Sequence, residues 1–149
     1  MKIKNLRAEF VKHVPEKLAE GVLYISEEFE TAGHLCCCGC GEEIFTPLNS
    51  AQWRLTKNAR SGTVSLYPSI GNWKYACQSH YWIKNNSVVE AGPMSDHVIN
   101  AVIKRDRRDK HRFFEAHNQT RTAPSTISPQ EKPQPSRFFA RFIKWVSGL

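Results

Sequence analysis

The sequence predicts an α+β protein, in which a small antiparallel β core precedes a basic helix and a tethered amphipathic helix. Three observations lead to this prediction. The first 93 residues contain short stretches of alternating polar and apolar side chains, four of the five cysteines lie within residues 36–40, and basic charge is concentrated after residue 93. A chain of 149 residues, 40% of them hydrophobic, has room for one domain with appendages.

Strands are expected where β-forming residues cluster or alternate with polar ones. Residues 52–56 and 63–67 both alternate, and the segment between them has the composition of a loop, so the two are expected to pair antiparallel. The Asn85-Asn86 pair lies between two apolar stretches and predicts a hairpin turn. Pro15 and the residues up to Gly21 predict one brief helical turn. The expected strands cover residues 22–25, 52–56, 63–67, 81–83 and 88–89.

The character of the chain changes at Gly92-Pro93. Ser95 is expected to cap a helix within residues 94–117 that is apolar on one face at its start and basic over residues 104–112. Residues 94–149 hold 11 Lys or Arg and 5 Asp or Glu, against 10 and 9 in residues 1–93. Attraction to nucleic acid or to an acidic partner is therefore expected only from the C-terminal third, where the interspersed Asp residues favour a solvated helix.

The last residues divide into a tether and a second helix. Residues 118–136 are rich in Thr, Ser, Pro and Gln and are predicted to form a disordered linker. Residues 137–149 restore a helical period, and their apolar face is expected to bind a protein partner or to fold back onto its own domain. Binding to a membrane surface is the less favoured alternative, because three cations give little electrostatic anchoring. The residues on that face are Phe139, Phe142, Ile143 and Val146.

The cysteines predict that a metal ion organises residues 1–93. An odd number of tightly clustered cysteines is a poor disulfide framework, whereas two turns that each offer two ligands build a tetrahedral site. The candidate ligands are Cys36, Cys38, Cys40, Cys77 and His80. Alternation along an extended segment excludes Cys37 from the set. Glycines at 39 and 41 favour Cys38 with Cys40 over Cys36 with Cys38, and both pairs remain open.

Zinc is the expected metal, because the spacing fits three cysteines and one histidine. Paired Cys-x-Cys and Cys-x-x-His turns also hold iron–sulfur clusters, so an iron–sulfur centre is the alternative. A zinc ion with four protein ligands stabilises a fold and does not activate water, which argues against metallohydrolase chemistry.

The motifs around these cysteines resemble a bacterial family of small predicted zinc proteins, catalogued as a domain of unknown function. Its core reads HLCxCGCGE, TPL, WxL, SLxPSIGNW and CxSHYWI. In this chain the corresponding segments are residues 34–42, 46–48, 53–55, 65–73 and 77–83. The resemblance covers residues from about 20 to 91 and departs at Cys37, where members of the family usually carry Pro or another residue.

The resemblance implies a zinc site, a bacterial source and, for some members, gene neighbourhoods with ubiquitin-like conjugation enzymes. A peptidase that removes a ubiquitin-like protein from its conjugates is therefore one hypothesis. In such a peptidase a serine would be the nucleophile, activated by a histidine that an acidic residue orients. The candidates are His34, Glu42, Ser65, Ser69 and Ser79. For Ser79 the competing interpretation is a hydroxyl that hydrogen-bonds a metal-bound thiolate.

Three functions stay open at this point. The first is a zinc-binding adaptor module in a ubiquitin-like conjugation pathway, with a ubiquitin-like protein or its conjugates as partner. The second is the peptidase, and the third is a nucleic-acid-binding accessory protein. No apolar run reaches the roughly 20 residues of a membrane-spanning helix, and no secretory signal begins the chain, so a cytoplasmic protein is expected.

Overall fold

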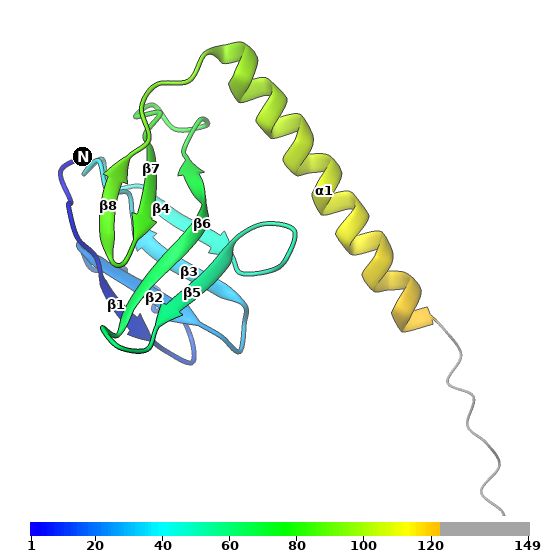
Figure 1. Ribbon diagram of the computed structural model, residues 1–149, viewed down its shortest axis with the longest axis horizontal. Helices are drawn as coiled ribbons and strands as arrows, with labels where there is room; N and C mark the ends of the chain where they lie inside the picture. Colours follow the sequence, from blue (N-terminus) through cyan, green and yellow to red (C-terminus); the bar gives the residue numbers. More distant parts are fainter. Residues whose placement is uncertain (123–149) are drawn as a thin grey trace, which may run out of the picture.

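The computed structural model describes residues 1–122 and contains two four-stranded sheets and one helix (Figure 1). The first sheet has the strand order β1 (Arg7–Phe10), β2 (Val22–Ser26), β3 (Thr31–Leu35), β4 (Glu43–Pro47). The second has the order β5 (Arg54–Asn58), β6 (Thr63–Gly71), β7 (His80–Lys84), β8 (Ser87–Glu90). Among the strands of residues 1–122, only β1 and β2 pair in parallel. The α+β class and its antiparallel core are confirmed.

The second sheet follows the sequence pattern closely. β5 and β6 pair antiparallel with Leu55 opposite Leu66, as their alternation predicts. β7 and β8 form the expected hairpin, and Asn85 and Asn86 both have positive φ, at 47° and 67°. Asn tolerates this left-handed conformation better than most residues, which suits a two-residue turn.

The first sheet was largely missed. Only β2 was expected, whereas β1, β3 and β4 are also strands, and no helical turn forms between Pro15 and Gly21. β3 contains Gly33, whose Cβ position lies 3.0 Å from side-chain atoms of Phe45 and Val14. A glycine depresses strand propensity in the sequence, and here close packing of neighbours against the backbone compensates for it.

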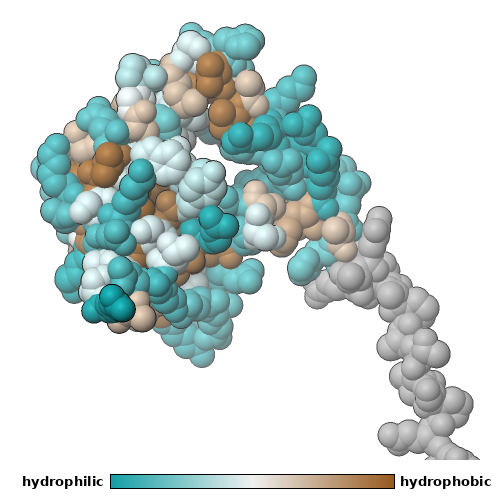
Figure 2. All heavy atoms as spheres, in the orientation of Figure 1, coloured by the Kyte–Doolittle hydropathy of each residue, from teal (hydrophilic) through white to brown (hydrophobic). Residues whose placement is uncertain are grey.

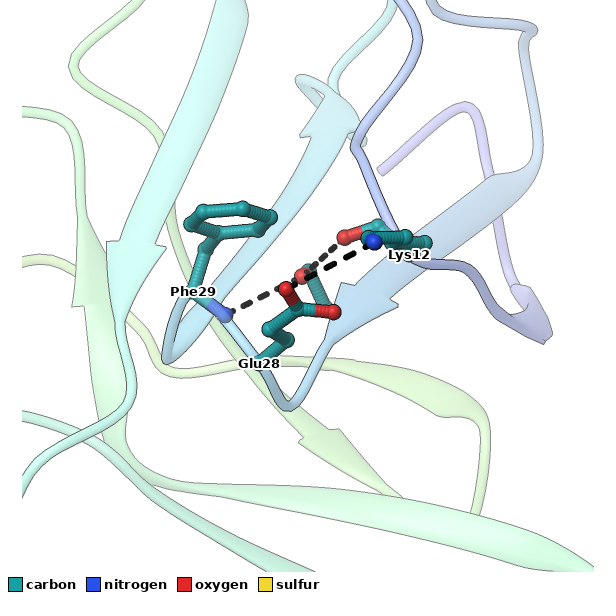
Figure 3. Close-up of polar contacts among 4 residues, drawn as sticks. Lys12, Glu28 and Phe29 are labelled. Carbon is teal, nitrogen blue, oxygen red and sulfur yellow. Dashed lines mark hydrogen bonds and ion pairs between the residues drawn. The ribbon is translucent and has the colours of Figure 1, made fainter.

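A buried serine ties the edge of the first sheet together (Figure 3). The Ser26 hydroxyl donates to the Lys12 carbonyl oxygen at 2.6 Å and accepts from the Phe29 amide at 3.3 Å. Lys12 and Glu28 add an ion pair at 3.8 Å across the same turn. These contacts fix the β2–β3 turn against the segment that follows β1.

The core contains inward-facing side chains of both sheets. Its fully buried members include Leu23 and Ile25 from β2, Leu66 from β6, and Tyr81 and Ile83 from β7. Each large apolar side chain buried in this way contributes about 1.5–3 kcal/mol to the free energy of unfolding. The outward-facing residues of β6 and β7 are left available for a site on the surface of the second sheet.

Helix α1 (Asp96–Thr122) follows the second sheet and lies to one side of the strands in Figure 1, and Figure 2 shows a gap between part of the helix and the rest of the protein. It covers the helix expected in residues 94–117 and extends into the range predicted as linker. Residues 123–136 of that linker and the expected helix at 137–149 lie outside the described residues, with Phe139, Phe142, Ile143 and Val146. Within residues 1–122, no helix is both long and apolar enough to cross a membrane.

Candidate functional site

Four cysteines, hereafter the four-cysteine group, bring their sulfur atoms within 4.8 Å of one another. The members of the group are Cys36, Cys38, Cys40 and Cys77. The first three lie in the turn between β3 and β4, and Cys77 lies in the connection between β6 and β7. Gly39 and Gly41 have φ of 89° and 88°, which lets the first turn fold back on itself. The group therefore links the two sheets.

The group fits a tetrahedral metal ion. Zinc–sulfur bonds near 2.3 Å place four sulfur atoms about 3.8 Å apart. The Cys36 and Cys38 sulfurs are 3.4 Å apart, and every pair lies within 4.8 Å, so small side-chain adjustments suffice. Burial raises the pKa of the Cys77 thiol, but hydrogen bonds with Ser79 and with neighbouring thiols outweigh burial and lower the pKa to about 7. A thiol that ionises readily is a good metal ligand.

Two buried polar residues hold the connection that carries Cys77. The Asn72 side chain donates to Ser79 Oγ at 2.8 Å, and the Asn72 amide donates to the Ser79 carbonyl oxygen at 2.9 Å. Ser79 Oγ is also 3.1 Å from the Cys36 sulfur. Residues 72–79 are thus closed into a loop whose hydroxyl touches the four-cysteine group. Ser79 is buried at 6% exposure, and its hydroxyl lies against a cysteine sulfur and away from Ser69 and Ser65.

His80 makes its hydrogen bonds away from the cysteines. Its Nε2 lies 2.9 Å from Ser69 Oγ, and its Nδ1 lies 3.1 Å from the Gly92 carbonyl oxygen. Because a carbonyl oxygen only accepts, Nδ1 carries the proton of the neutral ring, and Nε2 accepts from the Ser69 hydroxyl. A serine hydroxyl that donates to an oriented imidazole is the arrangement of an activated nucleophile and its base.

The strand pairing explains why Ser69 and His80 meet. Gly71 lies opposite His80 in the β6–β7 ladder, and Ser69, two residues earlier, lies on the same face. Diagonal neighbours on one face are within reach of a long side chain such as histidine. The register shifts between Leu66 and Ile70, so Ser69 lies within an irregularity of β6. Such bulges reorient side chains and are common beside active sites.

Trp73 packs beside the pair. A Cβ atom at Gly71 would lie 2.5 Å from Cε2 and 2.7 Å from Cζ2 of the Trp73 indole, so the ring lies directly on the glycine backbone. The Trp73 and His80 ring centroids are 4.9 Å apart. The absence of a side chain at Gly71 therefore makes room for the indole that packs against the imidazole.

Ser69 and His80 line a cavity of about 710 Å³ between the second sheet and α1. Its sheet side is aromatic, with Trp53, Tyr67, Trp73 and Trp82, and its opposite side is formed by residues of α1. A cavity of this volume is large enough for a short peptide segment. Ser69 thus lies on the wall of a cavity that a ligand can enter.

The remaining catalytic candidates lie elsewhere. His34 is fully buried, its Nε2 is 2.9 Å from the Tyr81 hydroxyl, and burial lowers the pKa of His34 to about 4. Ser65 Oγ accepts the Asn85 amide at 2.8 Å. Glu42 is exposed, and its carbonyl oxygen accepts the Cys36 amide at 2.8 Å. Among residues 1–122, no hydrogen bond joins His34 or Glu42 to Ser65, Ser69 or Ser79.

The sequence predicts both Ser69 and His80 as site residues, but in different sites, Ser69 as a catalytic candidate and His80 as a metal ligand. Cys37, which alternation excludes from the ligand set, is fully buried, and burial raises the pKa of its thiol to about 12. A signal for the pairing existed, because a hairpin that pairs residues 66–71 with 80–83 places Ser69 and His80 on one face. The sequence alone does not predict this pairing, because the length of the loop between the two strands does not determine their register.

Comparison with protein families gives a match over more than half of the chain. The family described as "Bacterial ubiquitination-like system serine protease (BubE)" matches residues 10–91. The chain belongs to this family. No curated protein and no solved structure matches it. The matched BubE region includes the four-cysteine group, Ser69 and His80, and it ends before α1. The link to a ubiquitin-like system that the resemblance implied is confirmed.

Proposed function

We propose that this BubE protein is a serine peptidase acting on a ubiquitin-like protein or its conjugates, with Ser69 as nucleophile and His80 as general base. The observation that carries the proposal is the 2.9 Å contact between Ser69 Oγ and His80 Nε2, with Nδ1 held by the Gly92 carbonyl. The backbone carbonyl takes the orienting role that a carboxylate has in a Ser-His-Asp triad. The family description supports the same reaction class.

The reaction follows from this geometry. Ser69 Oγ attacks the substrate carbonyl carbon while its proton passes to His80 Nε2, giving a tetrahedral oxyanion. Collapse of that intermediate breaks the bond to the leaving amine, which takes the proton from Nε2 and departs. An ester now joins the acyl group to Ser69. Water then gives a proton to Nε2 and attacks the ester, and Ser69 leaves with the proton returned.

The four-cysteine group has a supporting role in this proposal. When zinc is bound, four thiolates close its coordination sphere, so the metal stabilises the fold. Cys77 and Ser79 lie in the connection that leads directly into His80. We infer that the four-cysteine group fixes the position from which the His80 imidazole reaches Ser69. An adaptor without catalysis would need the same metal site but not the aligned hydroxyl and imidazole.

The test uses a fusion of a ubiquitin-like protein from a bacterial conjugation system to a reporter. The zinc-loaded protein should cleave the junction, and Ser69→Ala or His80→Ala should lower kcat/KM by at least about 1,000-fold. Ser65→Ala is the matched control, because it removes a hydroxyl from the same strand outside the pair. Cleavage that survives Ser69→Ala, or a folded wild-type protein that cleaves no junction, would favour the adaptor function.

A further inference from the structure

The cavity that holds Ser69 and His80 has two unlike walls. The sheet wall is aromatic, and the rings of Tyr67 and Trp82 lie there with centroids 5.9 Å apart. The α1 wall contributes Arg105, Arg107 and Lys110, with Asp106 as its acidic residue. The cavity thus combines an apolar surface with an excess of positive charge facing it.

Within residues 1–122, carboxylates do not neutralise the basic wall. Arg105 contacts its neighbour Asp106 at 3.4 Å, and both side chains are 56% exposed. Within the part of the chain that the structure describes, no ion pair joins Arg107 or Lys110 to a carboxylate. Lys74, on the β6–β7 connection, adds a fourth cation to the cavity lining. Four cations and one carboxylate favour an anionic ligand.

The dimensions suit an extended peptide. The α1 segment from Val102 to Lys110 spans about 12 Å at 1.5 Å per residue. An extended chain covers that length with about four residues. A segment of this kind passing Ser69 would place its side chains alternately toward the aromatic wall and toward the cations of α1.

We propose that this cavity is the substrate-binding channel and that α1 selects a peptide with acidic residues beside the scissile bond. This proposal rests on the proposed function, because the Ser69–His80 pair is what favours a peptide over other anions. Aromatic rings and cations together also suit single-stranded nucleic acid, which is therefore a competitor in the test. Helix α1 lies beyond the matched residues 10–91, so the selecting wall is separate from the BubE region.

The test measures binding with the full-length Ser69→Ala protein, so that it does not depend on hydrolysis. The probes are a fluorescein-labelled peptide of Leu, Gly and Glu, its counterpart with Lys in place of Glu, and a labelled oligothymidylate. Exposed ion pairs are individually weak, so three of them should give the acidic peptide about a tenfold advantage in Kd over the basic one. Fluorescence anisotropy at low salt measures each Kd.

Two triple variants separate the cavity wall from general charge. Arg105→Glu/Arg107→Glu/Lys110→Glu should abolish the preference for the acidic peptide. Lys104→Glu/Arg108→Glu/Arg112→Glu makes the same change in net charge on the same helix outside the cavity lining, and the preference should persist. Circular dichroism checks that both variants keep the helix.

Three outcomes overturn the proposal: equal loss in both triple variants, no preference between the peptides, or tighter binding of oligothymidylate than of the acidic peptide. The fusion-cleavage assay with active protein tests the proposed function separately, so its failure can be told apart from each of these three outcomes. If the protein binds the acidic peptide through α1 but cleaves no substrate, the cavity is a peptide-binding channel and the proposed peptidase function is wrong.

Discussion

Gly71→Ala should disturb the serine–histidine pair through Trp73. The added Cβ would lie 2.5 Å from Cε2 of the indole, whereas carbon atoms in good contact are about 3.5–4.0 Å apart. The ring must therefore retreat by about 1 Å. Gly71 is the last residue of β6 and is not among the glycines with positive φ, so the alanine backbone itself is unstrained.

The size of the effect follows from that displacement. Overpacking of this kind costs about 1–3 kcal/mol of the free energy of unfolding. Because the Trp73 ring packs 4.9 Å from the His80 ring, its movement also disturbs the imidazole. A misplacement of about 1 Å in a catalytic group lowers the rate by about 100-fold. Urea denaturation measures the first effect, and kcat/KM for the fusion substrate measures the second.

The double variant Gly71→Ala/Trp73→Ala supplies the control. With the indole removed, the new methyl group meets no ring, so the double variant should be as stable as Trp73→Ala alone to within about 0.5 kcal/mol. Two results would show that the indole does not lie on Gly71 as described. One is that the effects of the two substitutions on the free energy of unfolding are additive. The other is that Gly71→Ala has the same stability and the same kcat/KM as the wild type.

Three further predictions concern the metal, the buried loop and the C-terminal residues. Removal of zinc by a strong chelator, or Cys77→Ser, should abolish the cooperative thermal transition, because structural zinc contributes about 10–16 kcal/mol and whole domains retain about 5–15 kcal/mol; metal analysis of folded protein that finds neither zinc nor iron would refute this. Ser79→Ala should cost about 1–3 kcal/mol, because the Asn72 side-chain amide loses its 2.8 Å acceptor and is left with the 3.5 Å contact to the Cys36 sulfur. The Ser69 reaction should persist, and loss of that reaction with unchanged stability would contradict the assignment of Ser79. Truncation after Asn118 should leave metal content and the thermal transition intact. In the full chain, Phe142→Asp/Ile143→Asp should abolish association with a partner. A truncated protein that lacks a cooperative thermal transition would instead show that the C-terminal residues belong to the core.

The sequence predicted best where the signal is local. Alternation identified β5 and β6, and Asn85-Asn86 identified the β7–β8 turn, because both patterns depend on neighbouring residues. The cysteine cluster was equally visible, since three members lie within residues 36–40. β3 and β4 were missed because the packing of Phe45 over Gly33 is a contact between strands and not a property of either segment.

The site depended on register, which the sequence did not determine. Cys77-x-x-His80 was interpreted as two ligands of one metal ion because the spacing permits it. In the structure the β7 strand begins at His80 and turns its side chain toward Ser69, while Cys77 remains in the loop with the other cysteines. A bulge in β6 sets where Ser69 lies, and such irregularities have no clear signature in one sequence.

The activated serine is tested most directly by a fluorophosphonate probe, which phosphonylates a serine oxygen only when a base removes its proton. The zinc-loaded protein should be labelled at Ser69, as located by peptide mass spectrometry, and His80→Ala should abolish the label while the protein still folds. Ser65 and Ser79 should remain unlabelled. A folded, zinc-loaded protein that takes up no label, or takes it up at another serine, would contradict the assignment of Ser69 and His80 as nucleophile and base.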